Sequence, residues 1–504
     1  MAEWLKAHAW KACIPQGIVG SNPTLSVLFR GAIKERIMAI KFGTDGWRAV
    51  ISDEFTFENV RIVAQAIASY VNDKKLGGKG IIVGYDPRFL ADHYAEEIVK
   101  VLHSNGISCF MTDRDTPIPV VAFSVKDKKT GGAVMVTASH NPPQYCGMKF
   151  IPDYGGPAFS NITDHIERHL KNAEKISAKP SLKLERFNPM KRYQKHLEEL
   201  IDFDLIKKAR LKIAYDPLWG TGRDYLDRIL QDIGCEVTVI HGYRDVLFGG
   251  ITPEPIGEHL KELKDVVVKG GCAAGVSTDP DADRFGLIDE KGNYVSANQA
   301  ISAVFAYLAD ERGETGSVAR SVATTHLIDA IAEANGIKVH ETPVGFKHIA
   351  EIMLKEQVIL GGEESGGLTI GGHIPEKDGI LANLLICEMI AKYKKPLSQI
   401  IKSVSDKYGY FYNKRVNLKL TPTMKEALMK ILENEPPSRL AGSKLNHISK
   451  LDGVKMVFDD KSWILARPSG TEPIVRTYYE NTSESNLRTT VQDFESFITS
   501  HVGV

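Results

Sequence analysis

The chain alternates short apolar runs with helical patterns, and this alternation restricts the folds it can adopt. The run at 81–84 leads into Tyr85-Asp86-Pro87-Arg88, and the run at 212–215 leads into Asp216-Pro217. Buried strands that break into such turns, separated by helices, are typical of α/β layers with a largely parallel sheet. We expect strands at 81–84, 107–110, 133–136, 212–217, 236–240, 274–276, 318–324 and 338–341, and helices at 57–71, 224–233, 327–335 and 378–393, with another ending near 103.

At 504 residues the chain is too long for one hydrophobic core, and three or four domains are expected. The last part of the chain has a different pattern of elements, with expected strands at 410–420, 454–458 and 463–467 and helices at 423–434 and 485–500. This pattern indicates a smaller α+β domain. Candidate joints lie at 171–189, 290–293 and 394–396. We place the domains at 38–189 (serine loop), 190–296 (acidic loop), 297–408 (Gly-rich loop) and 409–504 (arginine loop).

Residues 1–37 differ from the remainder of the chain, because they show neither helical nor strand periodicity and no signal-peptide core. The tetrapeptide Gly20-Ser21-Asn22-Pro23 can be encoded by a sequence that reads like the T-arm of a transfer-RNA gene. We therefore expect 1–37 to be a non-native or disordered leader and Met38 to be the native start.

The balance of charge excludes some classes of partner. Lys+Arg and Asp+Glu are both 63, so the chain has no bulk electrostatic reason to bind nucleic acid or an acidic membrane. Its six cysteines are scattered without a C-x-x-C pair, and no apolar run reaches the roughly 18–20 residues of a membrane span. We expect a cytoplasmic protein with reduced thiols, acting as a monomer or homodimer.

The segment 137–142, Thr-Ala-Ser-His-Asn-Pro, follows the apolar run at 133–136. Ser139 is thus presented at the end of a strand, where α/β proteins keep their chemistry, with His140 beside it. An ordinary surface turn contains the same residue types, so the segment alone decides nothing.

A second loop carries Asp279, Asp281 and Asp283. On extended backbone, acidic residues at every second position point to the same side and repel one another unless a cation lies between them. All-oxygen ligands suit Mg²⁺, and the spacing lacks the later Glu of a twelve-residue Ca²⁺ loop. A solvated acidic turn is the alternative.

Two further loops are rich in glycine or arginine. Glu363 and Ser365 stand among glycines in 361–367, where they could hydrogen-bond neighbouring sugar hydroxyls. The segment 467–473 is Arg-Pro-Ser-Gly-Thr-Glu-Pro, and Arg476 follows it. Two guanidinium groups, two hydroxyls and the amides around Gly470 could cradle a phosphate.

With these four loops in this order, residues 38–504 closely resemble the α-D-phosphohexomutase superfamily of phosphoglucomutases and phosphomannomutases. The resemblance implies three α/β mixed-sheet domains of shared topology and a C-terminal α+β domain like the TATA-binding protein, arranged around a cleft. It makes Ser139 the phosphoryl carrier. It assigns Mg²⁺ to Ser139, Asp279, Asp281 and Asp283, sugar hydroxyls to Glu363 and Ser365, the distal phosphate to Arg467, Ser469, Gly470 and Thr471, and active-site positions to Arg48, Lys149 and Arg284.

The reaction implied is the interconversion of hexose 1-phosphate and hexose 6-phosphate. Phosphorylated Ser139 would first give a bound hexose 1,6-bisphosphate, which reorients and returns its other phosphate to the serine. Proton transfer would fall to Lys149, His140 or Lys347. Phosphoryl transfer needs positioning and charge neutralisation more than covalent assistance, which suits these residues.

The preferred sugar is less sharply indicated. Gly345-Phe346-Lys347 and Glu363-Glu364-Ser365-Gly366 resemble the glucose-specific pattern, whereas 43–46 and 469–473 resemble phosphoglucosamine mutases. Pro280 stands where Gly is usual and Cys146 where Asn is common, without loss of a ligating side chain. We expect glucose phosphates, with mannose or glucosamine phosphates as alternatives; a non-catalytic sugar-phosphate binder or a phosphatase fits the residues less well.

Overall fold

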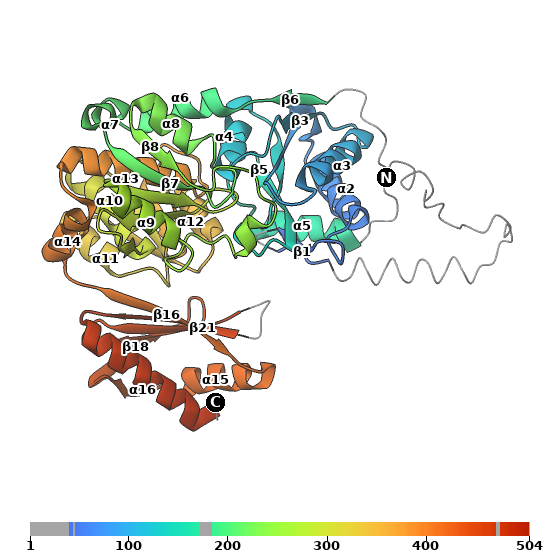
Figure 1. Ribbon diagram of the computed structural model, residues 1–504. Coiled ribbons are helices and arrows are strands. Elements are labelled where there is room, and N and C mark those ends of the chain that lie inside the picture. Colours follow the sequence, from blue (N-terminus) through green and yellow to red (C-terminus); the bar gives the residue numbers. More distant parts are fainter. Residues whose placement is uncertain (1–39, 44–45, 172–183, 470–473, 503–504) are drawn as a thin grey trace, which may run out of the picture. The chain divides into compact units, whose positions relative to one another are not determined.

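The computed structural model describes residues 40–43, 46–171, 184–469 and 474–502. The expected leader at 1–37 lies outside these ranges, as do Gly470 and Thr471. The chain divides into two units, Met1–Lys41 and Phe42–Val504. Within the described part of the second unit the strands form four sheets, and some of these strands are labelled in Figure 1.

The first sheet has the strand order β1-β5-β4-β2-β3-β6. Its inner strands β4, β2 and β3 run parallel, while β5 and β1 are antiparallel to their neighbours. All residues of β2 and β4 are buried, as expected where helices cover both faces of a sheet. The elements are β1 (Trp47–Val50), α2 (Phe57–Asp73), η2 (Gly77–Lys79), β2 (Ile81–Tyr85), α3 (Ala91–Ser104), β3 (Cys109–Thr112), α4 (Ile118–Lys128), β4 (Gly132–Val136), β5 (Tyr145–Pro152), α5 (Ser160–Lys171) and β6 (Glu185–Phe187).

The second sheet has the order β11-β10-β9-β7-β8 and is also mixed. Its parallel strands β9, β7 and β8 are followed by the antiparallel β10 and β11. The elements are α6 (Met190–Leu200), α7 (Phe203–Ala209), β7 (Lys212–Asp216), α8 (Leu226–Ile233), β8 (Glu236–Val239), η3 (Phe248–Gly250), α9 (Lys261–Gly270), β9 (Ala274–Thr278), β10 (Phe285–Asp289) and β11 (Tyr294–Val295).

The third sheet, of order β13-β12-β14-β15, pairs three parallel strands with one antiparallel strand. The helix α13 is buried on every side and packs against β9 and β10 of the second sheet as well as β15 of its own. The elements are α10 (Ala297–Asp310), β12 (Ser317–Ser321), α11 (Leu327–Asn335), β13 (Val339–Thr342), α12 (Phe346–Met353), β14 (Val358–Glu363), β15 (Gly367–Ile370), α13 (Gly379–Tyr393) and α14 (Leu397–Tyr408).

The C-terminal sheet is wholly antiparallel, with the order β16-β21-β20-β19-β18-β17. Its two helices, α15 (Pro422–Asn434) and α16 (Glu484–Val502), cover one face (Figure 1), and a separate apolar cluster fills the space between helices and sheet. The strands are β16 (Tyr412–Lys419), β17 (Arg439–Leu440), β18 (Ser443–Ser449), β19 (Val454–Phe458), β20 (Trp463–Pro468) and β21 (Ile474–Asn481). The expected α/β and α+β architecture is confirmed.

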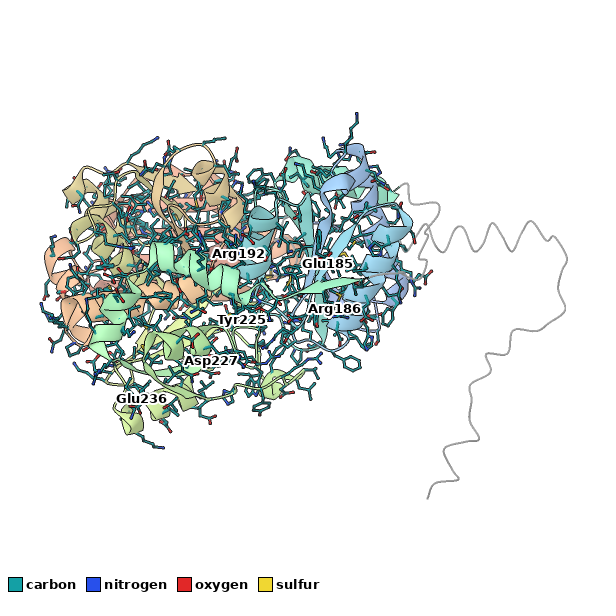
Figure 2. All side chains as sticks on the ribbon, turned by 90° about the horizontal axis from the view of Figure 1, so that it is seen from above. Glu185, Arg186, Arg192, Tyr225, Asp227 and Glu236 are labelled. Carbon is teal, nitrogen blue, oxygen red and sulfur yellow. The ribbon has the colours of Figure 1, made fainter. Side chains whose placement is uncertain are left out.

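Two of the expected joints are parts of sheets. Within 171–189, β6 pairs with β3 at the edge of the first sheet, where Glu185 and Arg186 are exposed (Figure 2). Charged side chains are common on short edge strands, and this charge made the segment look like a linker. Residues 290–293 form the hairpin turn between β10 and β11.

Several buried elements were not expected from the pattern. The helix α4 is one of them, because its residues Ile118 to Val125 are all buried and leave no polar face to reveal a helical period. The described cysteines, at positions 109, 146, 235, 272 and 387, are buried with free thiols. Within the described ranges no helix is both long and apolar enough to cross a membrane.

Candidate active site

Ser139 lies in the turn that follows β4. Its backbone φ is +50°, in the left-handed region, and the residue is 2% exposed. Its amide donates a hydrogen bond to Oγ1 of Thr137 over 2.9 Å. A residue other than glycine adopts this conformation only where its surroundings hold it there. The turn therefore fixes the direction in which the Ser139 hydroxyl points.

The fully buried Arg88 holds this turn in place. Its guanidinium donates to the carbonyl oxygens of Ser139 (2.5 Å), Asn141 (2.7 Å), Pro142 (2.9 Å) and Tyr145 (2.9 Å). Its Nε also lies 3.0 Å from Oδ2 of the buried Asp86. One planar group thus joins the turn after β2 to the turn after β4, a geometry that lysine cannot reproduce.

The three aspartates of the acidic loop, Asp279, Asp281 and Asp283, are each at most 1% exposed. One carboxylate oxygen from each lies within 4.8 Å of the others. The expectation of extended backbone is wrong, because Ala282 has φ +56° and its amide donates to the carbonyl of Asp279. Alternate residues of a strand are about 6.6 Å apart, so this turn gathers the carboxylates more closely than a strand would.

Within the triad, the pKa values of Asp279 and Asp283 are shifted in opposite directions. Burial raises the pKa of Asp279 well above its ordinary value, and the charges of Asp281 and Asp283 add to the effect. Burial acts in the same direction on Asp283, but Lys377, Lys149 and Arg284 outweigh it and hold its pKa below the ordinary range. Each like charge in such a cluster is costly unless cations neutralise it.

The triad has spare ligand atoms. Oδ1 of Asp281 and Oδ1 of Asp283 are buried and have no hydrogen-bond partner among the described residues. Lys377 Nζ lies 2.8 Å from Oδ2 of Asp283, and Lys149 Nζ lies 3.4 Å from Oδ2 of Asp281. Two unpartnered buried carboxylate oxygens, beside a third buried carboxylate from Asp279, form an all-oxygen donor set that fits Mg²⁺.

The serine turn and the acidic loop meet directly. Ser139 Oγ donates to Oδ2 of Asp279 over 2.9 Å, and Thr137 Oγ1 lies 3.1 Å from Oδ2 of Asp281. The amide of Ile118, at the start of α4, donates to the carbonyl of Asp281. Residues from the first two sheets therefore converge on one centre.

His140 and two arginines complete the surroundings of Ser139. His140 Nδ1 lies 3.3 Å from Ser139 Oγ. Burial lowers the His140 pKa well below its usual value, and the charges of Arg284 and Arg48 lower it further, so the imidazole is neutral near pH 7. Arg48 Nη1 donates to Oδ1 of Asn141 over 2.7 Å, and the Arg284 amide donates to Oδ1 of Asp279 over 3.0 Å.

A pocket opens beside the triad between the first and third domains. Asp283, Lys149, Lys347, Glu376 and Lys377 are among the residues that line it. Lys347 Nζ donates to Ser160 Oγ, which begins α5 (3.1 Å). Burial raises the Glu376 pKa to about 7. The pocket thus offers cations beside a carboxylate that changes charge near neutral pH.

The Gly-rich loop is the hairpin between β14 and β15. Glu363 ends β14 and is 5% exposed, and its Oε1 accepts from the amide of Gly345 over 2.7 Å. Burial, assisted by the charge of Glu364, raises the Glu363 pKa to about 7. Ser365 is half-buried in the turn. Glu364 instead accepts from Ser321 within its own domain (2.8 Å).

The arginine loop lies on the C-terminal sheet. Arg467 on β20 and Arg476 on β21 are directly opposed partners, and like charges placed opposite each other favour an anion between them. Ser469 is 5% exposed, and its carbonyl accepts from Lys425 Nζ on α15 over 2.6 Å. Gly470 and Thr471 lie outside the described residues.

Asp452 links the arginine loop to the third domain. Its Oδ2 accepts from Arg467 Nε (2.7 Å) and from the amide of Val344 (3.0 Å). Val344 precedes Gly345, whose amide donates to Glu363. A continuous path of contacts therefore runs from the arginine pair to the Gly-rich loop.

Sequence reasoning missed Arg88, Lys377, Glu376, Lys425 and Asp452. Arg88 stands in a turn that the sequence analysis noted, yet its partners lie more than fifty residues away. Lys377 follows a His-Ile-Pro-Glu stretch without any motif of its own. No local pattern reveals such residues, because their role depends on which distant loops the fold places beside them.

Comparison with known proteins decides the family. Four models described as phosphoglucomutase/phosphomannomutase match in succession, namely alpha/beta/alpha domain I at 39–177, domain II at 191–292, domain III at 296–408 and the C-terminal domain at 416–496. The chain belongs to this family. It is a phosphohexomutase, an isomerase of carbohydrate metabolism, and the resemblance noted from the sequence is confirmed.

Individual relatives differ in the sugar that their names specify. A phosphoglucomutase/phosphomannomutase of Thermococcus kodakarensis is 31% identical over 450 residues, covering 89% of this chain and 96% of the relative. A phosphoglucosamine mutase of Clostridium acetobutylicum is 29% identical over 468 residues, covering 90% and 97%. A solved structure described as a phosphomannomutase from Thermus thermophilus is 31% identical with a TM-score of 0.81, covering 91% and 99%.

Replacing Arg88 by alanine tests how the serine turn is held. We expect the free energy of unfolding to fall by about 3–5 kcal/mol, because the change leaves Asp86 as an unpaired buried charge and frees four carbonyls. The measurement is equilibrium unfolding in urea, monitored by fluorescence. Arg192→Ala is the matched control, since Arg192 is an exposed residue of α6 (Figure 2) that pairs with Asp127 of α4, and its loss should change little. Equal stability of the two variants would contradict the role of Arg88.

Proposed function

We propose that this chain interconverts glucose 1-phosphate and glucose 6-phosphate through a phosphoserine at Ser139 and a bound glucose 1,6-bisphosphate. The contact of 2.9 Å between Ser139 Oγ and Asp279 carries the proposal. The Ser139 hydroxyl, which the left-handed backbone turn at Ser139 presents, thus lies among three buried carboxylates and several cations. That arrangement suits transfer of a phosphoryl group, whose negative charge must be neutralised.

The residues that would hold Mg²⁺ are Asp279, Asp281 and Asp283, together with the phosphorylated Ser139. Two unpartnered buried carboxylate oxygens support this assignment. When bound, the ion neutralises charge on the transferring phosphoryl group. Lys149 and Lys377 already pair with Asp281 and Asp283, and with Arg284 they balance part of the charge on the loop.

In the first transfer, the bond between phosphorus and Ser139 Oγ breaks while a bond to the free hydroxyl of the sugar monophosphate forms. The proton that the sugar hydroxyl loses balances the proton that the departing serine oxygen takes up. His140 Nδ1 lies 3.3 Å from Ser139 Oγ and belongs to a neutral imidazole, which can accept a proton, so we assign His140 as the base that takes the Ser139 proton when the serine is rephosphorylated in the second transfer. Lys149 and Lys347 are the candidates on the substrate side.

The second transfer requires the bisphosphate to turn around, so a distal site must accept the phosphate at either end of the sugar. We assign this task to Arg467, Arg476 and Ser469, with Gly470 and Thr471 of the same loop. Opposed arginines support the assignment, because they bind phosphate without reading the sugar. Asp452 orients Arg467 and contacts the backbone before Gly345, which couples this site to the Gly-rich loop.

Glu363 and Ser365 are assigned to the sugar hydroxyls, and Gly345-Phe346-Lys347 together with 363–366 favour glucose. Glu363 is fixed by the Gly345 amide and has little exposure, so an unsuitable hydroxyl pattern would leave its carboxylate unpaired. Mannose phosphates are the second candidate, because one relative carries both names.

A phosphatase would use the same residues but pass the phosphoryl group to water. Ser139 is 2% exposed, and the three aspartates are buried almost completely. Such burial limits access of water to the phosphoserine and favours transfer to a bound sugar.

A panel of sugar phosphates tests the function. We expect isomerisation of glucose 1-phosphate to exceed that of mannose and glucosamine 1-phosphates, with a stimulation by a trace of the matching 1,6-bisphosphate. Ser139→Ala should lose activity at least about 10³-fold, because no other residue carries the phosphate. The measurement is a coupled assay of the 6-phosphate and of free phosphate. Release of phosphate without isomerisation would establish a phosphatase instead.

In the same assay, Asp281→Asn and Asp283→Asn separate the metal assignment from the serine assignment. Each variant should need a higher Mg²⁺ concentration for half-maximal rate, because a ligand is weakened. Full activity with an unchanged Mg²⁺ requirement in both variants would remove the metal assignment while leaving the role of Ser139 open to its own test.

The pH dependence tests Glu363. Its carboxyl has a pKa of about 7, and the ionised form accepts hydrogen bonds from sugar hydroxyls, so kcat/KM should rise as pH increases through about 7. In Glu363→Gln this limb of the profile should disappear. Glu376→Gln is the matched comparison, because burial raises the Glu376 pKa to the same value, and its profile should keep the limb. If the rise of kcat/KM near pH 7 disappears in Glu376→Gln and remains in Glu363→Gln, the titrating carboxyl is Glu376 and the assignment to Glu363 is wrong.

A further inference from the structure

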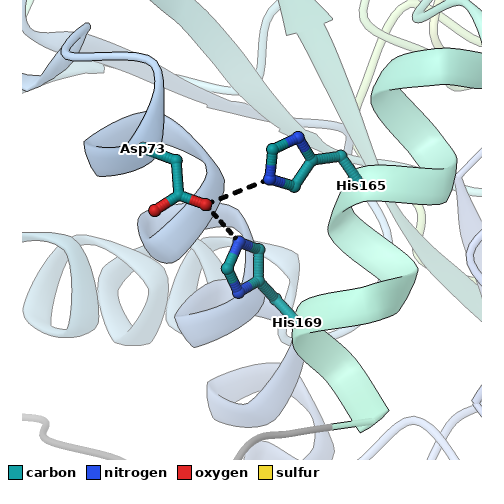
Figure 3. Close-up of side chains that lie close together, drawn as sticks. All are labelled: Asp73, His165 and His169. Carbon is teal, nitrogen blue, oxygen red and sulfur yellow. Dashed lines mark hydrogen bonds and ion pairs between the residues drawn. The ribbon is translucent and has the colours of Figure 1, made fainter.

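A second group of metal-ligating side chains lies on the first domain, formed by Asp73, His165 and His169 (Figure 3). Asp73 ends α2, and the two histidines are one turn apart on α5, the helix that packs against it. Residues at positions i and i+4 share a face of a helix, which is why both imidazoles point toward α2. Neither the sequence motifs nor the proposed mechanism uses this group.

The three side chains converge on one point. His165 Nε2 lies 3.0 Å and His169 Nε2 lies 2.8 Å from the same oxygen, Oδ2 of Asp73 (Figure 3). The two imidazole rings stack with centroids 5.2 Å apart and an interplanar angle of 19°. Tyr70 packs edge-on against His165 at 5.3 Å. Both Nε2 atoms are therefore already directed at the carboxylate by packing.

This geometry suits one metal cation between the two Nε2 atoms and the carboxylate better than it suits a proton on each Nε2. In the ion-free state both Nε2–H groups must donate to one carboxylate oxygen. A bound cation replaces both protons at once, since each neutral imidazole can carry its proton on Nδ1 and offer the Nε2 lone pair. The side chains of His165, His169 and Asp73 are 20%, 26% and 48% exposed, so an ion can reach them from solution.

The donor set indicates the class of ion. Two imidazole nitrogens and one carboxylate oxygen are ligands that Zn²⁺ and similar transition metals prefer, whereas Mg²⁺ and Ca²⁺ prefer oxygen alone. The acidic triad at Asp279 has only oxygen ligands, so the two sites differ in the ions they favour. Three protein ligands leave one tetrahedral position for water.

We propose that Asp73, His165 and His169 form a surface site for a divalent transition-metal ion of the Zn²⁺ class, separate from the acidic triad. The ion ties the end of α2 to α5 and so stabilises the packing of these two helices. The proposal does not depend on the sugar or on the phosphoserine.

Calorimetric titration with Zn²⁺ tests the site, with the full-length protein kept in a large excess of Mg²⁺ so that oxygen-only sites are occupied. The wild type should bind one Zn²⁺. The single variant His169→Ala and the double variant His165→Ala/His169→Ala should bind Zn²⁺ at least about tenfold more weakly, since even outer-shell changes alter metal affinity by 10–100-fold. His93→Ala is the matched control, because His93 is an exposed histidine of the same domain, 61% exposed on α3. It should bind Zn²⁺ like the wild type.

Two further measurements keep the outcomes distinct. Zn²⁺ should raise the melting temperature of the wild type and of His93→Ala but not of the double variant. Asp281→Asn should retain the Zn²⁺ affinity of the wild type. Equal Zn²⁺ affinity in the wild type and in the double variant would overturn the proposal, as would loss of the bound Zn²⁺ in Asp281→Asn alone, which would assign the ion to the acidic triad.

Discussion

The hydrogen bond between Ser139 Oγ and Asp279 is the contact on which the rest of the site depends. It lies within a cluster of three buried carboxylates, an arrangement that is unfavourable by itself. Cations from three domains offset it, with Lys149 from β5, Arg284 after the acidic loop and Lys377 before α13. The charge cluster therefore couples the positions of the first three domains to the chemistry that they share.

The sequence predicts the fold class well, and the reason is local. Strands such as β2 and β4 are fully buried, apolar runs that are followed by turn residues. Their positions and their identity as strands can therefore be predicted from the local sequence alone. The helix at 327–335 and the strand at 454–458 have the bounds that the pattern predicts. Each loop also follows a strand or lies between strands, where functional side chains are commonly presented.

What the sequence does not predict is how distant residues complete those loops. Arg88 supports a turn more than fifty residues away, and Asp452 connects Arg467 to a backbone amide more than a hundred residues earlier. The acidic loop shows the same limit, because the left-handed Ala282 gathers its carboxylates where an extended strand was expected. Such contacts depend on tertiary structure, which no periodicity encodes. The pairing of the edge strand β6 with β3 is also a tertiary contact, and the exposed charged residues of β6 gave the segment the appearance of a linker.

The central claim is that Ser139 carries the phosphoryl group between the two transfers. Incubation with glucose 1,6-bisphosphate labelled with ³²P, followed by proteolysis and peptide mapping, measures this directly. The account predicts label on the peptide that contains Ser139 and transfer of that label to unlabelled glucose 6-phosphate added afterwards. Label on another residue, or label that passes only to water while isomerisation proceeds, would contradict it.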